Sequence, residues 1–269
     1  MNRKRKISYI LFPCIFIGCF VVYAYLTKGQ RFEQIEYSIE YPSDTLFVKE
    51  DFSQYINSHC PVVIGKLFDS VNLSTFEKKV EEYPYISNAD VIHNKKTLIV
   101  KAKQEKIIAK ITNRRGEEFL LAQSGKLVPK RKNSGRIIVA NGNIPNRYVV
   151  GYFVGREETS DKSKGKKNYS PLYTVWKIAC FIENDPFWKA QTGQIYVNEK
   201  QEIELVPTVG DHIILFGKIA LHEDADKTVQ QRFDNLKYLY TEGFKITGWE
   251  RYKLINLKYG TEIPCEKKK

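Results

Sequence analysis

The longest uninterrupted apolar pattern in the chain covers residues 7–26, in which no side chain is charged. At about 1.5 Å of rise per residue, a helix of this length spans about 30 Å, the thickness of the hydrocarbon core of a bilayer. Four basic residues at positions 3–6 precede it, and such a cluster favours the cytoplasmic side. We therefore expect a cytoplasmic tail at 1–6, one transmembrane helix at 7–26 and export of the rest.

Two other processing routes compete with an uncleaved anchor. A signal peptidase could accept the small-residue spacing that ends at Ala24, and Cys19 after Gly18 could be a lipid attachment site. A signal peptide needs only about 7–15 apolar residues, whereas this apolar run continues beyond both sites to Leu26. The length of the run favours the anchor, and the two alternatives stay open.

The pattern changes after the membrane segment and predicts a compact α+β domain at 31–105. Alternating apolar positions indicate strands, and apolar positions three and four residues apart indicate helices. A cap at Asn72 or Ser74 and a stop at Tyr83-Pro84 delimit the second helix. The predicted order is strand, helix, helix, strand, strand, at 30–41, 49–58, 72–82, 86–93 and 97–103.

The region 106–265 consists of many short strand-like segments separated by turns and loops. This pattern predicts a mostly antiparallel β domain with two helices. Ser170-Pro171 starts the first helix, and a stripe through Val229 and Phe233 marks the second. A charged stretch at 157–168 is typical of a solvated loop. Short strands are predicted at 107–112, 118–122, 137–140, 194–198, 202–206, 212–217 and 252–259, followed by a short extended segment at 261–265 and a basic tail at 266–269.

Composition narrows the class of protein further. Hydrophobic residues make up 42% and charged residues 28% of the 269 positions, which excludes an intrinsically disordered chain. A mean hydropathy of −0.41 excludes a protein with many membrane spans. The net charge is +12, and outside the N-terminal cluster the basic residues are spread over loops and the tail. Solubility and attraction to lipid head groups or acidic partners explain this charge better than nucleic-acid binding.

The reactive side chains form no recognisable catalytic, cofactor-binding or metal-binding set. The four histidines are scattered without metal-ligand spacing, and no phosphate loop, dinucleotide fingerprint or nucleophile elbow occurs. Gly210-Asp211-His212 is explained by a turn that opens a strand. The sequence therefore predicts a protein that is not an enzyme and has no cofactor.

Three cysteines lie outside the predicted membrane segment, so they cannot all pair with one another. A disulfide between Cys180 and Cys265 is one option, because sequence alone does not give connectivity. Cys180 lies on an apolar helix, where a cysteine usually behaves as a small buried hydrophobic residue. Whether any two of Cys60, Cys180 and Cys265 pair stays open.

The order of these elements resembles the bacterial cell-division family FtsQ/DivIB, in a Bacteroidetes-like form. In that family one membrane helix is followed by a POTRA domain and a β domain, so 31–105 is expected to be POTRA-like with the order βααββ. The late strand ending in Ile255-Asn256-Leu257-Lys258-Tyr259 is the nearest match. The other similar segments are YPYISNADV at 83–91, LIVKA at 98–102, SGKLVP at 124–129, GDHIILFG at 210–217 and RFDNL at 232–236.

The resemblance implies a non-enzymatic scaffold of the divisome in the cell inner membrane, with its N-terminus in the cytoplasm and its domains in the periplasm. Its expected partners are FtsB/FtsL-like single-pass proteins, bound by strand addition at the C-terminal edge of the β domain. Tyr259, Thr261 and Ile263 are the predicted partner-binding residues. Pro264 removes a backbone donor from this segment. The POTRA-like domain is expected to hold other divisome proteins.

Two alternative functions come from other classes of protein. One is a POTRA-bearing envelope assembly or translocation factor, which would usually carry several such modules or a membrane barrel. The other is an anchored cell-wall enzyme whose catalytic set is not recognisable.

Overall fold

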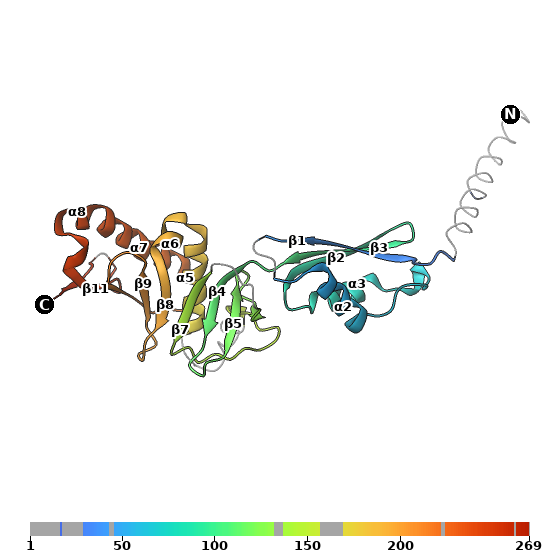
Figure 1. The fold of residues 1–269 in the computed structure, drawn as a ribbon, viewed down its shortest axis with the longest axis horizontal. Helices are drawn as coiled ribbons and strands as arrows, with labels where there is room; N and C mark the ends of the chain where they lie inside the picture. The colour runs from blue at the N-terminus through green and yellow to red at the C-terminus, as the bar shows by residue number, and fades with distance from the viewer. Residues whose placement is uncertain are drawn as a thin grey trace, which may run out of the picture. The chain divides into compact units, whose positions relative to one another are not determined.

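The computed structural model describes residues 17, 29–42, 46–131, 137–156, 169–221, 224–260 and 262–268. The chain divides into two compact units (Figure 1). Unit 1 contains the chain up to Glu40 together with Lys49–Tyr83 and Asn88–Ala102. Unit 2 contains Tyr41–Val48, Pro84–Ser87 and Lys103–Lys269. The whole is a mixed α+β structure, which confirms the predicted class.

Unit 1 has the predicted order of two helices between the first strand and the last two. Its strands form one sheet in the order β1-β3-β2. A short 3-10 helix, η1, precedes the second helix and was not predicted. The elements are β1 (Gln34–Glu40), α2 (Lys49–His59), η1 (Phe68–Ser70), α3 (Leu73–Glu81), β2 (Ile86–Asn94) and β3 (Thr97–Gln104).

Helices α2 and α3 cover one face of this sheet (Figure 1). Asn72 caps α3, because its side chain accepts a hydrogen bond from the Thr75 N–H. Phe52 on α2 and Phe76 on α3 are almost fully buried, as is Leu98 on β3. The apolar stripes of the two helices and the alternation of β3 therefore meet in one core.

Unit 2 is built on a nine-stranded sheet with the order β12-β11-β10-β9-β8-β7-β4-β5-β6. Three neighbouring pairs are parallel, β10 with β11, β4 with β7 and β7 with β8, and the other pairs are antiparallel. The strands are β4 (Ile107–Thr112), β5 (Glu118–Ala122), β6 (Leu127–Pro129), β7 (Ile138–Gly142), β8 (Thr192–Val197), β9 (Ile203–Pro207), β10 (Ile213–Gly217), β11 (Tyr252–Asn256) and β12 (Cys265–Lys267).

The helical part of unit 2 is larger than the two predicted helices. Besides α5 (Pro171–Asn184) and α7 (Ala225–Tyr238), it contains α6, η3, α8 and η4. Asp185 separates α6 from α5, since its carboxylate accepts the N–H groups of Phe187 and Trp188 and starts a new helix. These further elements are α6 (Pro186–Gln191), the π-helical turn η3 (Leu239–Gly243), α8 (Phe244–Thr247) and the 3-10 turn η4 (Trp249–Arg251).

The last predicted strand is too long, and the predicted tail is part of the sheet. β11 ends at Asn256 rather than at residue 259, because the Asn256 side chain accepts the Lys258 N–H and turns the chain. The chain then returns, and β12 pairs antiparallel with β11. Glu266 and Lys267, predicted in a basic tail, are strand residues.

The predicted membrane segment falls almost entirely outside the described residues. Of 7–26 only Ile17 is described, and the predicted cytoplasmic tail at 1–6 and charged loop at 157–168 are not described. Within the described ranges, no helix is both long enough and apolar enough to cross a membrane. Outside that segment the three cysteines, Cys60, Cys180 and Cys265, are all free thiols.

We expect the aromatic contact between α5 and α7 to be a main support of unit 2. Phe233 is fully buried, and its ring stacks on Phe181 with 4.4 Å between centroids. Phe233→Ala should lower the free energy of unfolding by about 3–5 kcal/mol, because the cavity cannot close fully. Tyr238→Ala, at a 69% exposed position of the same helix, should change it by less than about 0.5 kcal/mol. Denaturant unfolding of both variants checks this, and equal losses would contradict it.

Candidate functional site

The C-terminal end of the nine-stranded sheet is the candidate site, because its last strand has a neighbour on one side only. β12 pairs with β11, and it ends the sheet in the described part of the chain. The Asn256 N–H donates to the Pro264 carbonyl over 2.9 Å, so these two residues face each other across the ladder. Pro264 therefore lies with its backbone toward β11, and its missing N–H affects the inner side of the ladder rather than the outer edge.

The outer edge of β12 consists of the backbone of two residues. Bonded and non-bonded pairs alternate along an antiparallel ladder, so Cys265, next to Pro264, directs its N–H and C=O away from β11. The Lys268 N–H donates to the Arg251 carbonyl over 3.0 Å. The same alternation then turns the backbone of Lys267 outward. This edge presents donors and acceptors for one further strand.

Tyr259 and Ile263, two of the predicted contact residues, lie between β11 and β12 rather than on a strand. Tyr259 is 58% exposed, and its carbonyl accepts the Glu262 N–H in a turn. Ile263 is half-buried and packs against the core of unit 2. Thr261 lies outside the described residues. The side chain of Asn235 on α7 donates to the carbonyl of Gly260, which fixes the loop beside that helix.

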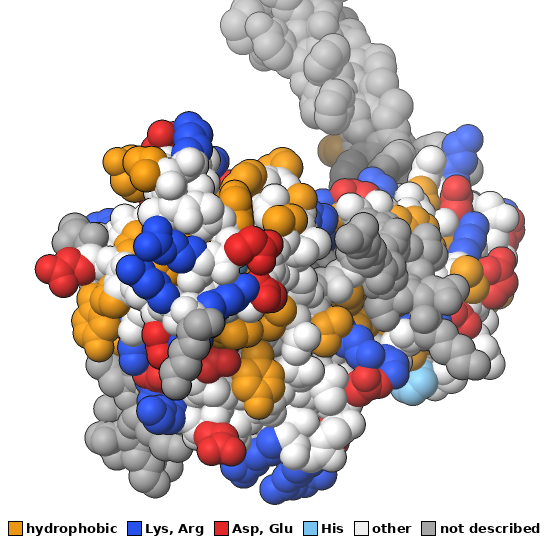
Figure 2. All heavy atoms as spheres, turned by 60° about the vertical axis from the view of Figure 1, so that its left-hand side comes forward, with side chains coloured by type: hydrophobic (Ala, Val, Ile, Leu, Met, Phe, Trp, Pro, Cys, Tyr) orange, Lys and Arg blue, Asp and Glu red, His pale blue; other side chains and the backbone are white. Residues whose placement is uncertain are grey.

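Ion pairs that the sequence did not indicate hold β12 in place. Lys268 lies 2.5 Å from the Asp211 carboxylate and 3.7 Å from that of Glu250. The hydrogen bond from Lys268 lowers the pKa of Asp211. Lys253 on β11 pairs with Glu266 on β12 over 2.7 Å. These partners are far apart in sequence, and no local pattern identifies them. The view in Figure 2 brings this end of unit 2 forward and shows basic, acidic and hydrophobic side chains side by side.

An aromatic cluster lies at the same end of unit 2 and encloses His212. The His212 side chain is fully buried, and its Nε2 lies 2.7 Å from the hydroxyl of Tyr240. The rings of Phe244 and Trp249 pack around it. Burial lowers the pKa of His212, although the nearby Asp211 raises it. His212 is therefore a neutral core residue, and Asp211 points to Lys268 instead of forming a catalytic pair with it.

A separate hollow of about 560 Å³ lies between α5, α6 and the sheet. Its lining is mostly apolar and includes Ile108, Ile138 and Ile182. Its charged residue Glu183 is paired with Lys106 over 3.3 Å and with Lys189 over 2.8 Å. The carboxylate of Glu183 is thus held between two lysines at the edge of an apolar wall.

The thiols are also poor nucleophiles. Burial raises the pKa of Cys60 to about 11 and that of Cys180 to about 12, so both stay protonated at neutral pH. Among the described residues, no group of three or more histidine, cysteine or acidic side chains could hold a metal ion. At the β12 end of the sheet, the feature that could bind a partner is therefore the outer backbone edge of the strand.

A family model described as FtsQ/DivIB, C-terminal related, matches residues 106–266, which is more than half of the chain. The chain belongs to this family. The match begins just before β4 and ends inside β12, so it covers the nine-stranded sheet except for Lys267, the last residue of β12. The resemblance expected from the sequence is thus confirmed, and the family connects the chain with bacterial cell division. FtsQ/DivIB proteins are non-enzymatic, membrane-associated division proteins. No curated protein matches the sequence.

The buried His212 makes the stability of this site depend on pH. Its folded-state pKa is lowered, so the unfolded chain binds more protons below the ordinary histidine pKa of about 6.5. Stability should be fully present above that pH and be lost as the pH falls below it. His212→Gln should reduce this loss by up to about 1.4 kcal/mol per pH unit.

Unfolding free energies of the two proteins at about pH 7.5 and about pH 5.5 test this expectation. The other three histidines are common to both proteins and cancel in the comparison. An identical pH dependence of the wild type and the variant would contradict it.

Proposed function

We propose that this chain is a non-enzymatic scaffold of the division machinery that binds an FtsB/FtsL-like protein by strand addition to the outer edge of β12. The single observation that carries the proposal is the outward direction of the Cys265 and Lys267 backbone at the last strand of the sheet. An added strand would continue the ladder, with affinity from main-chain hydrogen bonds and selectivity from neighbouring side chains.

In this proposal the loop residues act beside the added strand. Tyr259 offers a large, exposed aromatic surface of the kind that dominates many interfaces. Ile263 is half-buried against the core and would hold the base of the loop. Thr261 is the third proposed contact, and it rests on the sequence resemblance alone. The ion pair between Lys268 and Asp211 keeps β12 ordered before a partner arrives, so that less ordering entropy is lost on binding.

The anchor and the domain boundaries complete the proposal. Residues 7–26 would hold the chain in the inner membrane, with residues 1–6 in the cytoplasm and the domains at 31–105 and 106–265 in the periplasm. The POTRA-like domain at 31–105 and the β domain at 106–265 would then be two docking modules on one anchor. Unit 1 has the edge strands β1 and β2, which are the places where another division protein could extend its sheet.

Removing one outward backbone donor tests the strand addition. Lys267→Pro deletes the N–H that an added strand would use, whereas Lys267→Ala removes only the side chain. A buried acceptor left without its donor costs about 1–3 kcal/mol, so Lys267→Pro should weaken binding of an FtsB/FtsL-like protein by about 5-fold to about 150-fold. Lys267→Ala should leave the affinity within about twofold.

A second pair of variants tests the loop. Tyr259→Ala should weaken the same complex, while Tyr238→Ala, at a similarly exposed tyrosine on α7, should not. Calorimetry with the full chain measures all four variants, and their melting temperatures report whether each remains folded. If Lys267→Pro folds and binds as tightly as Lys267→Ala, β12 is not the docking edge.

A further inference from the structure

The loop between α2 and η1, residues 61–67, exposes more apolar surface than a short connection needs. Val62 is 69% exposed, Ile64 46% and Leu67 37%. Between them Val63 is buried and fixes the loop to the core of unit 1. Three apolar side chains on one rigid loop are typical of a surface that meets another apolar phase.

This loop is tied by backbone hydrogen bonds to the point where the chain enters unit 1. The Phe32 N–H donates to the Lys66 carbonyl over 3.1 Å, and the Gly65 N–H donates to the Phe32 carbonyl over 2.8 Å. The Arg31 guanidinium donates to the Gly65 carbonyl over 2.6 Å. Figure 1 shows η1, directly after the loop, beside the start of the chain that leads into β1. Three hydrogen bonds therefore join the loop to residues 31–32.

The entry point also limits how far the loop can lie from the membrane. The inference rests on the anchor proposed above, whose apolar run ends at Leu26. Five residue steps separate Leu26 from Arg31, and an extended chain covers at most about 3.6 Å per step. Arg31 is thus held within about 18 Å of the end of the anchor. The loop is hydrogen-bonded to residues 31–32 and therefore lies close to this point. The head-group layer lies within that reach.

The same end of unit 1 carries a surplus of basic side chains. Arg31 and Lys66 are exposed, and the turn after β2 adds Lys95 and Lys96. The Glu33 N–H donates to the Lys96 carbonyl over 2.8 Å, which places this turn beside the entry point. Glu33 is paired with Lys96, so its charge is already balanced. Basic residues around an apolar tip suit an anionic head-group layer.

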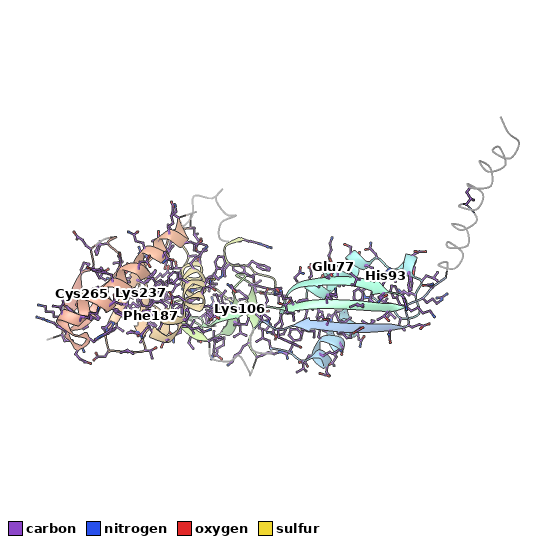
Figure 3. All side chains as sticks on the ribbon, turned by 90° about the horizontal axis from the view of Figure 1, so that it is seen from above. Glu77, His93, Lys106, Phe187, Lys237 and Cys265 are labelled. Carbon is purple, nitrogen blue, oxygen red and sulfur yellow. The ribbon has the colours of Figure 1, made fainter. Side chains whose placement is uncertain are left out.

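A packed base supports this tip. His93, labelled in Figure 3, lies near the end of β2, and its ring centroid is 5.0 Å from that of Phe68 and 5.9 Å from that of Phe32. Phe32 and Phe68 are themselves 4.6 Å apart. The three rings connect the segment that leads into β1 with β2 and η1, and η1 directly follows the loop.

We infer that loop 61–67 inserts Val62, Ile64 and Leu67 into the head-group layer of an anionic bilayer, with Arg31, Lys66 and Lys95 facing lipid head groups. Unit 1 is then fixed at the membrane by two attachments, the anchor helix and this loop. Two attachments restrict its rotation about the anchor and orient its sheet.

Tryptophan quenching by brominated lipids in full-chain proteoliposomes tests the insertion. Ile64→Trp and Val48→Trp form a matched pair, because their positions are 46% and 50% exposed. Val48 directly precedes α2, and the loop that carries Ile64 follows the end of α2. The eleven residues of this helix therefore separate Val48 from the loop by about 16 Å. The added emission of Ile64→Trp should be lost in brominated vesicles, and that of Val48→Trp should persist, after subtraction of the wild-type signal.

Lipid charge provides the second arm of the experiment. Quenching of Ile64→Trp should be stronger in vesicles with anionic phosphatidylglycerol than in pure phosphatidylcholine. Lys66→Glu in the Ile64→Trp background should weaken it, whereas Lys49→Glu, the same charge change at the other end of α2, should not. Equal effects of the two charge changes would contradict the basic rim.

Flotation of the wild-type chain with vesicles separates failure of the anchor from failure of the inference. If the chain floats and Ile64→Trp is quenched no more than Val48→Trp, the loop faces water or protein and the inference is wrong, while the anchor stands. If the chain does not float, the anchor proposed above is wrong and the inference is overturned with it.

Discussion

Backbone hydrogen bonding at the two ends of a sheet is the constraint on which this structure depends. In the described part of the chain, each inner strand of the nine-stranded sheet has a hydrogen-bonded strand on both sides, whereas the end strands β12 and β6 have one on one side only. The outer side of β6 is partly covered, because the Leu127 N–H donates to the Tyr152 carbonyl. At the C-terminal end the chain covers β11 with a strand of three residues and directs Cys265 and Lys267 outward. Pro264 accepts a bond from β11 and leaves that outer edge intact.

So short a strand requires support from outside its own ladder, and unit 2 supplies it in two forms. Lys268 is held by Asp211 and Glu250, directly after β12 ends. Tyr252 on β11 stacks on Phe244, which also contacts the buried His212. The aromatic cluster therefore links the inner side of β11 to the loop that carries Asp211.

Much of this arrangement could be predicted from periodicity, and the failures have local causes. The strands and helices of unit 1 were predicted because their apolar faces are regular and Asn72 is a strong cap. The end of β11 was predicted at residue 259, because Ile255, Leu257 and Tyr259 alternate as in a strand. In the structure the Asn256 side chain accepts the Lys258 N–H and turns the chain earlier. β12 was missed because Cys-Glu-Lys has no apolar alternation and its pairing is set by distant residues. The outward backbone groups depend on register, which sequence does not specify for so short a strand.

Amide hydrogen exchange of the full chain, with and without an FtsB/FtsL-like partner, tests the central claim most directly. Strand addition predicts that the partner slows exchange of the Cys265 and Lys267 amides. The Lys268 amide is already bonded to the Arg251 carbonyl and should change less. A complex that forms with unchanged exchange along β12 would contradict the claim and place the docking surface elsewhere.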